Sequence, residues 1–258
     1  MRDLGFAAVV AVFLWWLGTG VVLRLDRMPS ATFRRTMLLS SLATAGALLG
    51  LAMLRDNLSV GAAYGSFTLA LVVWAWSETT FLTGLVTGRQ RGPCPPEASA
   101  WRRFGHGVDA LAHHEIAIAV GAIAIAATCW DAPNRIGLWT YLALWALRTS
   151  AKLNLFLGVR NTGVEMLPAH LDYLSSLFGR RPMNPLMPVS ILAGLLAAGF
   201  VVAGAVEPDA SSFERTGLSL LGALILLGVL EHLLMLAPIR SSVLWKGFGN
   251  VSRGNAAR

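Results

Sequence analysis

The chain has 258 residues, of which 55% are hydrophobic and 14% charged, and its mean hydropathy is +0.60. Soluble domains carry about 25% charged residues, so the composition excludes an ordinary soluble protein and predicts an integral membrane protein whose first partner is the lipid bilayer. The net charge of +7 does not indicate a nucleic-acid-binding protein, because no basic segment long enough for a domain lies between the apolar segments.

Apolar segments of membrane-spanning length occur seven times along the chain. Such segments of about 20 residues are typical of spanning helices. The sequence therefore predicts an all-α, polytopic helix bundle with about seven transmembrane helices, in a single domain over residues 1–258. The expected spans are Gly5–Leu23, Thr36–Leu54, Ser59–Val86, Val108–Trp130, Ile136–Leu157, Leu186–Val206 and Thr216–Leu236.

Basic residues are concentrated in alternate connections between these spans. Arg24, Arg27, Arg34, Arg35, Arg89, Arg91, Arg102, Arg103, Arg160, Arg180 and Arg181 fall on one side, together with Arg240, Lys246, Arg253 and Arg258 in the tail. Because positive charge marks the cytoplasmic side, we expect a periplasmic N-terminus and a cytoplasmic C-terminus. We expect the protein in the cytoplasmic or intracytoplasmic membrane.

Ionisable residues inside the predicted spans gather at the same cytoplasmic end. The third span ends beyond Glu78, and the fourth begins with His113, His114 and Glu115. The fifth ends with Arg148, Lys152 and Asn154, and the seventh ends with Glu231 and His232. Charged groups within a membrane are expensive and usually functional or paired. Four spans thus place polar side chains in one leaflet, which predicts that they meet.

Helical phase separates the two adjacent histidines of the fourth span. His114 shares a helix face with small residues, Ala117 and Gly121, which pack against neighbouring helices. His113 shares a face with Ile116 and Val120 instead. We therefore expect His114 and Glu115 inside the bundle and His113 at its edge.

The connection over residues 158–185 predicts a further short helix near residues 168–178. Leu167, Leu171, Leu174 and Phe178 form an apolar stripe, so we expect an amphipathic helix in the interface plane. His170 borders the stripe and Glu165 precedes it. Asn184 is expected to cap the next span, with a proline at its first helical position.

These polar residues admit two kinds of site. Carboxylates and imidazoles on facing helices are typical of di-iron and other transition-metal centres, which gives a candidate metal-ligand set: Glu78, His114, Glu115, Glu165, His170, Glu231 and His232. The same histidines could instead hold a tetrapyrrole, with a candidate set of His114, His170, His232, Asn154 and Lys152. The chain has no Glu-x-x-His pair.

The block "KLNLFLGVRN" at residues 152–161, followed by His170-Leu171-x-Tyr173-Leu174 and "MNPL" at 183–186, resembles the PuhE-type photosynthetic complex assembly proteins of purple phototrophic bacteria. Glu78 with "FLTG" at 81–84, and His113-His114-Glu115, are similar to the same family's pattern. The resemblance implies an inner-membrane protein that affects bacteriochlorophyll supply or photosystem assembly, with photosystem subunits or pigment-biosynthesis enzymes as partners. It transfers no catalytic residue.

Three functions remain open at this point. The first is an assembly or pigment-handling factor without turnover, binding a bacteriochlorophyll precursor, a haem or a metal. The second is a di-iron type oxidase or hydroxylase acting on a tetrapyrrole or an isoprenoid lipid. The third, a proton-linked transporter, is disfavoured because transporter sites tend to lie near the membrane midplane. Whether the protein is an enzyme stays undecided by the sequence.

Overall fold

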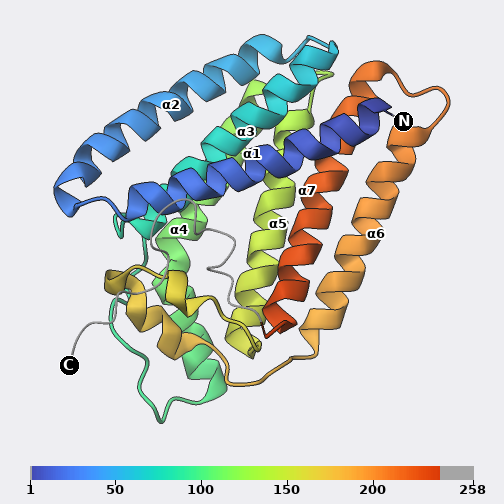
Figure 1. Cartoon of the computed structure of the whole chain (residues 1–258). Helices are drawn as coiled ribbons and strands as arrows, with labels where there is room; N and C mark the ends of the chain where they lie inside the picture. Colours follow the sequence, from blue (N-terminus) through green and yellow to red (C-terminus); the bar gives the residue numbers. More distant parts are fainter. Residues whose placement is uncertain (1, 239–258) are drawn as a thin grey trace.

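A computed structural model describes residues 2–238, and its long helices form one bundle (Figure 1). Their bounds are α1 Arg2–Asp26, α2 Phe33–Leu54, α3 Val60–Leu82, α4 Ala100–Thr128, α5 Ile136–Leu157, α6 Leu186–Val206 and α7 Ser212–Leu236, with short 3-10 helices η1 Ser30–Thr32, η2 Val164–Met166 and η3 Ala169–Leu177. The predicted all-α membrane fold is confirmed. The predicted basic tail beyond residue 238 lies outside the described residues.

Six of these helices are long and apolar enough to cross a membrane, namely α1, α2, α3, α4, α6 and α7. The helix that falls short is α5, which has the length but carries Arg148, Lys152 and Asn154 in its second half. It packs against α3, α4, α6 and α7. The predicted count of seven spans therefore depends on α5, whose polar residues face the protein's interior more than lipid.

The buried centre of the bundle lies where α7, α3 and α5 meet. Phe67 of α3, Leu144 of α5 and Leu220 of α7 share one apolar cluster. Small residues allow the close approach: a Cβ on Gly217 of α7 would meet the side chain of Ile136 at 2.3 Å. Of the six apolar helices, α7 is the most buried and α2 the least, as expected when one helix is surrounded and the other faces lipid.

The third helix ends four residues earlier than predicted, at Leu82 rather than Val86. Gly84 has a positive φ of 76°, a conformation that ends a helix and that glycine adopts without strain. The chain then runs along α4, where Arg89 N donates to Asp109 O at 2.8 Å. Gly88 makes this possible, because a Cβ there would lie 1.7 Å from that same Asp109 oxygen. A local glycine cap thus ends α3, and packing on α4 fixes the path of the segment that follows.

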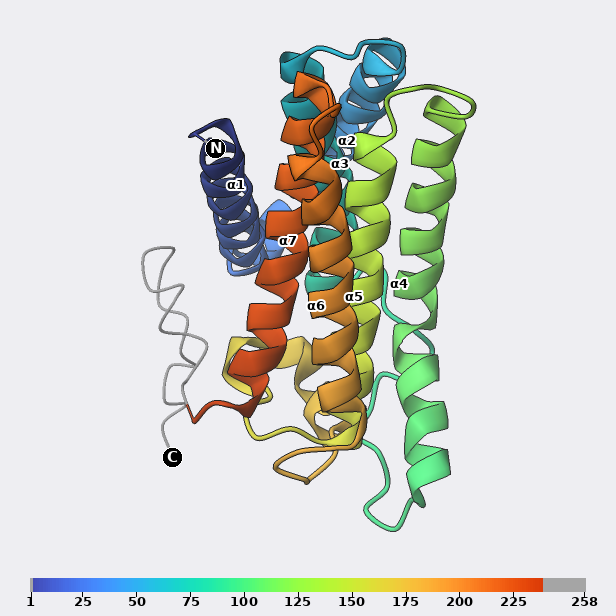
Figure 2. The ribbon, with the colours of Figure 1, turned by 90° about the vertical axis from the view of Figure 1, so that its right-hand side faces the viewer.

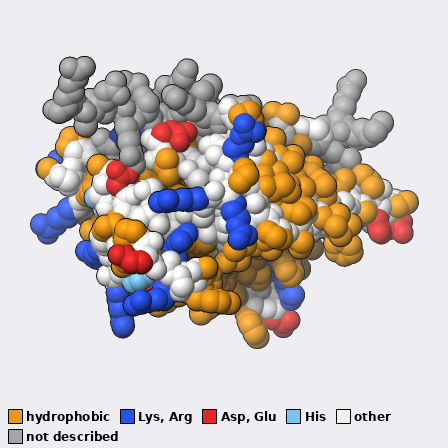
Figure 3. Space-filling model, turned by 90° about the horizontal axis from the view of Figure 1, so that it is seen from below, with side chains coloured by type: hydrophobic (Ala, Val, Ile, Leu, Met, Phe, Trp, Pro, Cys, Tyr) orange, Lys and Arg blue, Asp and Glu red, His pale blue; other side chains and the backbone are white. Residues whose placement is uncertain are grey.

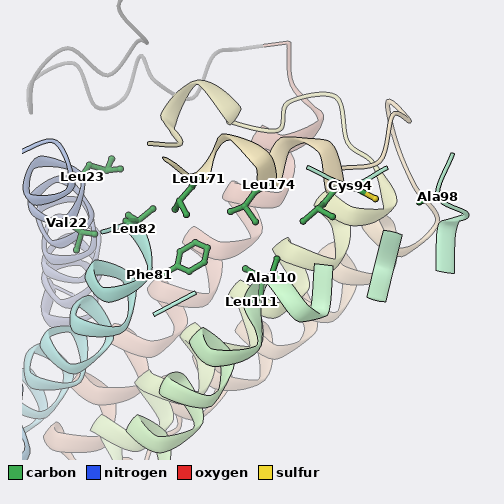
Figure 4. Close-up of a cluster of buried hydrophobic side chains, with 11 residues drawn as sticks. Val22, Leu23, Phe81, Leu82, Cys94, Ala98, Ala110, Leu111, Leu171 and Leu174 are labelled. Carbon is green, nitrogen blue, oxygen red and sulfur yellow. The ribbon is translucent and has the colours of Figure 1, made fainter. Parts of the chain in front are cut away.

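The predicted short helix in the 158–185 connection is present as the 3-10 helix η3. Its buried leucines are Leu171, Leu174 and Leu177, a spacing of three that matches three residues per 3-10 turn. They pack with Phe81, Leu111 and their neighbours over the end of the bundle (Figure 4). The apolar stripe therefore faces protein, not lipid as expected, and it includes Leu177 in place of Phe178.

Asn184 joins the end of α5 to the start of α6. Its Oδ1 accepts hydrogen bonds from the backbone N–H groups of Leu186 (3.0 Å) and Met187 (3.2 Å), which confirms the predicted capping role. Its Nδ2 donates to the carbonyl oxygens of Asn154 (3.2 Å) and Gly158 (2.9 Å). One side chain therefore satisfies backbone groups of two helix ends.

The end of the molecule that carries η3 is rich in basic side chains. Figure 3 shows Lys and Arg spread over this end, with a few Asp and Glu among them. The last residues of α1 reach the same end, since Val22 and Leu23 pack with Leu171. This matches the predicted segregation of charge, while the orientation in the membrane stays a prediction.

Candidate functional site

Arg148 on α5 is the centre of an ion-pair network between three helices. Its guanidinium lies 3.2 Å from Glu78 Oε2 of α3 and 3.7 Å from Glu231 Oε1 of α7. The Glu78 side chain is only 11% exposed, whereas those of Arg148 and Glu231 are 38% and 42% exposed. The network thus runs from the bundle interior towards its surface. A buried charge is tolerated when it is paired in this way.

A second ion pair joins α4 and α5 one turn further along. Lys152 Nζ lies 2.6 Å from Glu115 Oε1, and Trp145 Nε1 donates to Glu115 Oε2 at 3.1 Å. Each oxygen of this carboxylate therefore has a donor. Because Lys152 and Arg148 are four residues apart, they share one face of α5, which brings the two pairs together.

His114 is fully buried, and both of its ring nitrogens lack hydrogen-bond partners among the described residues. Its ring lies against Phe81, with centroids 4.4 Å apart. His113 is exposed on the outer face of α4, beside Ile116. The predicted positions of the two histidines are confirmed, whereas Glu115, expected inside the bundle, is 34% exposed at its side chain.

The other two candidate histidines make hydrogen bonds, His232 through both ring nitrogens and His170 through Nε2. His232 Nδ1 lies 2.7 Å from Gly228 O and its Nε2 lies 2.9 Å from Ser150 Oγ. A carbonyl only accepts, so Nδ1 donates and Nε2 accepts the serine hydroxyl proton. His170 Nε2 donates to Leu82 O at 2.8 Å, which holds η3 against the end of α3. Both rings serve packing between elements.

The remaining candidates lie apart from the ion pairs. Asn154 is fully buried and donates to Ser190 Oγ of α6 at 3.0 Å, so it holds two helices together. Glu165 lies in η2, and its Oε1 is buried without a hydrogen-bond partner in the described part of the chain.

Three of the four carboxylates expected to bind a metal are engaged with cations instead. Glu78, Glu115 and Glu231 each lie within ion-pair distance of Arg148 or Lys152. Among residues 2–238, no three His, Cys, Asp or Glu side chains are grouped so that they could hold a metal ion. The metal-ligand prediction therefore gains no support from the geometry.

Sequence reasoning placed Arg148 at the cytoplasmic end of the fifth span, but it gave no role to three side chains that make these contacts, namely Trp145, Arg148 and Ser150. A signal for two of them was present. Trp145 and Arg148 precede Lys152 by seven and four residues, so they recur on the same helix face. Ser150 had no such signal, because its role depends on where α7 places His232.

The fold and the paired charges define a polytopic helical membrane protein with an intramembrane ion-pair network. The chain belongs to the family described as "Protein of unknown function (DUF3623)", whose model matches residues 1–253. It is 36% identical over 249 residues to an uncharacterized 30.4 kDa protein in the puhA 5′ region of Rhodobacter capsulatus, an alignment that covers 95% of this chain and 90% of the relative. No solved structure matches the chain.

Proposed function

We propose that this protein is a membrane factor in photosystem assembly or bacteriochlorophyll supply, acting without turnover at its ion-pair network. The near full-length relationship to a protein in the puhA 5′ region of a purple phototrophic bacterium supports this role. The motif at residues 152–161, which resembles photosynthetic complex assembly proteins, ends α5 at this network. Partners in this role are photosystem subunits or pigment-biosynthesis enzymes.

The single observation that favours an assembly factor over a metalloenzyme is the pairing of the carboxylates. A di-iron site needs several Glu and His ligands that are free to reach one centre. Here Glu78 is held by Arg148 and Glu115 by Lys152, and His232 uses both ring nitrogens within the bundle. Recruiting these groups to a metal would break every one of these interactions.

A complementation experiment tests the assembly role. The gene of the Rhodobacter capsulatus relative is deleted and replaced by the gene of this chain or by its Arg148→Met variant. We expect the deletion to lower the near-infrared absorption of the photosystems, this chain to restore it, and the variant to restore less at equal membrane abundance. Unchanged absorption in the deletion strain would contradict the proposal.

A second candidate is pigment ligation by His114, favoured by its two unpartnered ring nitrogens. Since the ring is buried against Phe81, an axial ligand role requires the Phe81 side chain to move. An absorption spectrum of the purified protein tests it: a Soret band lost in His114→Leu but kept in His113→Leu supports ligation. Iron by elemental analysis without such a band would favour the metalloenzyme instead.

A further inference from the structure

An open groove runs along the outer face of the bundle, over α5 and between α4 and α6. Figure 2 shows α5 between these two helices. Its volume is about 640 Å³, and it is lined by Glu115, Leu142, Trp145, Ala146, Thr149, Ser150, Leu153 and Leu186. Six of these residues recur at spacings of three and four along α5, so they form one continuous face. From Leu142 to Leu153 this face is about 16 Å long.

One member of a charged pair, Glu115, lines the groove on the outer face of the bundle. The Glu115 side chain is 34% exposed and that of Lys152, its partner at 2.6 Å, is 13% exposed. Hydrocarbon chains cannot hydrogen-bond to an exposed carboxylate, so contact with bare lipid tails is unfavourable. An occupant with a polar group opposite Glu115 removes this penalty.

The chemistry of the pair specifies that polar group. Lys152 balances the charge of Glu115, so a charged head group would leave an excess charge in the groove. Each carboxylate oxygen accepts one hydrogen bond, from Lys152 or Trp145, among the described residues. A carboxylate oxygen has a further lone pair and accepts only. The head group is therefore uncharged and carries a hydroxyl or N–H donor.

The size of the groove separates a small molecule from a protein helix. Ligand sites typically have volumes of about 300–1,000 Å³, and the 640 Å³ of this groove falls in that range. A helix about 10 Å in diameter laid along 16 Å of α5 would need roughly 1,300 Å³. The dimensions thus favour an apolar molecule of lipid size.

We propose that the groove between α4 and α6 binds an uncharged, lipid-like molecule whose hydroxyl or N–H donates to Glu115, while its apolar body lies against Leu142, Ala146 and Leu153. This site lies beside the Arg148 network, since Arg148 and Lys152 share one face of α5, and the proposal does not depend on the assembly role.

Photolabelling in phosphatidylcholine vesicles tests the site. The reconstituted protein is irradiated with a long-chain alcohol carrying a diazirine, and the labelled peptides are identified by mass spectrometry. Two matched probes, the corresponding hydrocarbon and the corresponding fatty acid, are compared. We expect labelling of α5 in the groove, with roughly tenfold higher yield for the alcohol, the factor for a hydrogen bond to a charged group.

Ala146→Phe fills the groove and should abolish this labelling, because Ala146 is exposed there and tolerates a larger side chain. Ala45→Phe makes the same change on the exposed face of α2, away from the groove, and should leave labelling unchanged. Equal yields from alcohol and hydrocarbon, or labelling that survives Ala146→Phe, would overturn the proposal. So would exclusion of all three probes, which would favour a protein segment as the occupant.

Discussion

At the scale of single residues, a few charged and polar side chains explain why a largely apolar bundle tolerates ionisable groups. Arg148 contacts carboxylates of two other helices, and Lys152 contacts a third carboxylate. His114 differs from them, since it is buried but makes no hydrogen bond through its ring nitrogens within the described residues. Substitutions at these positions compare the effect of a paired charge on stability with the effect of an unpartnered polar group.

Replacing Arg148 by methionine should destabilise the protein by about 3 kcal/mol, because Glu78 would stay buried without a partner. We place this at the low end of the range for buried pairs since Arg148 is 38% exposed. The Glu78→Gln/Arg148→Met double variant should recover most of the loss. Thermal unfolding in detergent measures both, with exposed Arg160→Met as control. If the double variant lost as much stability as the two single variants together, Glu78 and Arg148 would not interact directly.

Replacing His114 by leucine should stabilise the ligand-free protein by about 1 kcal/mol, because an apolar side chain of similar size removes two unsatisfied nitrogens. The matched change His113→Leu, on the exposed face of the same helix, should have little effect. The midpoint of thermal unfolding is again the measurement. A lower midpoint for His114→Leu would mean that the imidazole makes a favourable interaction that its packing does not account for.

At the scale of elements, the segment between α3 and α4 lies between α4 and the 3-10 helix η3. Backbone groups of this segment bond to α4, with His114 N donating to Thr87 O at 3.2 Å. On the other side His170 lies over Gly84, where a Cβ would be 2.9 Å from the imidazole ring. The close approach of the His170 ring to the backbone at Gly84, and not only the burial of apolar side chains, therefore holds η3 in place.

Gly88→Ala should therefore be strongly destabilising, by about 3 kcal/mol or more, since its Cβ would overlap the backbone of α4 and neither partner can move freely. Gly92→Ala, in the same connection, has open space at its Cβ and should be neutral. Stability in detergent and proteolysis of the connection measure the difference. Equal behaviour of the two variants would show that the segment does not pack on α4.

Asn184→Ala should cost about 2–3 kcal/mol, because it removes a helix cap and leaves carbonyl groups at the end of α5 unsatisfied. Asn184→Ser should keep an oxygen that can cap α6 and lose the two donated bonds, so its loss should be smaller. The midpoints of thermal unfolding give the order of the two variants. If Ser were as damaging as Ala, the contacts to α5 would account for the whole effect.

At the scale of the whole molecule, the segregation of basic residues predicts how the bundle sits in the membrane. The end that carries η3 collects arginines from three connections, among them Arg27, Arg91 and Arg160. The opposite end pairs Arg55 with Asp56 at 3.5 Å. Positive charge is retained on the cytoplasmic side, so the η3 end is expected to be cytoplasmic.

Cysteine labelling from either side tests this orientation. The native thiols are unsuitable because Cys94 and Cys129 are buried, and burial raises the pKa of Cys129 and so lowers its reactive thiolate fraction. In a cysteine-free background, Glu97→Cys should react only with a reagent applied to the cytoplasmic side and Asp209→Cys only from outside. Both positions are exposed. The reverse pattern would invert the predicted topology.

Much of this arrangement followed from local pattern. Apolar length located all seven long helices, and the small residues beside His114 correctly turned that side chain inward. The site was only partly predictable. The gathering of Glu78, Glu115 and Glu231 near basic groups was expected. The pairing of Arg148 with two of these carboxylates was not, because the local sequence around a residue does not show which residues of other helices it will contact.

The sequence by itself determined the membrane class, the helix positions, the inward face of α4 and the asymmetry of charge, since each depends on composition or on a period of 3.6 residues. Only the tertiary structure decided that the segment after α3 packs on α4, that η3 buries Leu177, and that the carboxylates pair with Arg148 and Lys152. The physical reason is the same in each case. These features arise from contacts between segments far apart in the chain, and a buried charge takes whichever opposite charge the packing brings within reach.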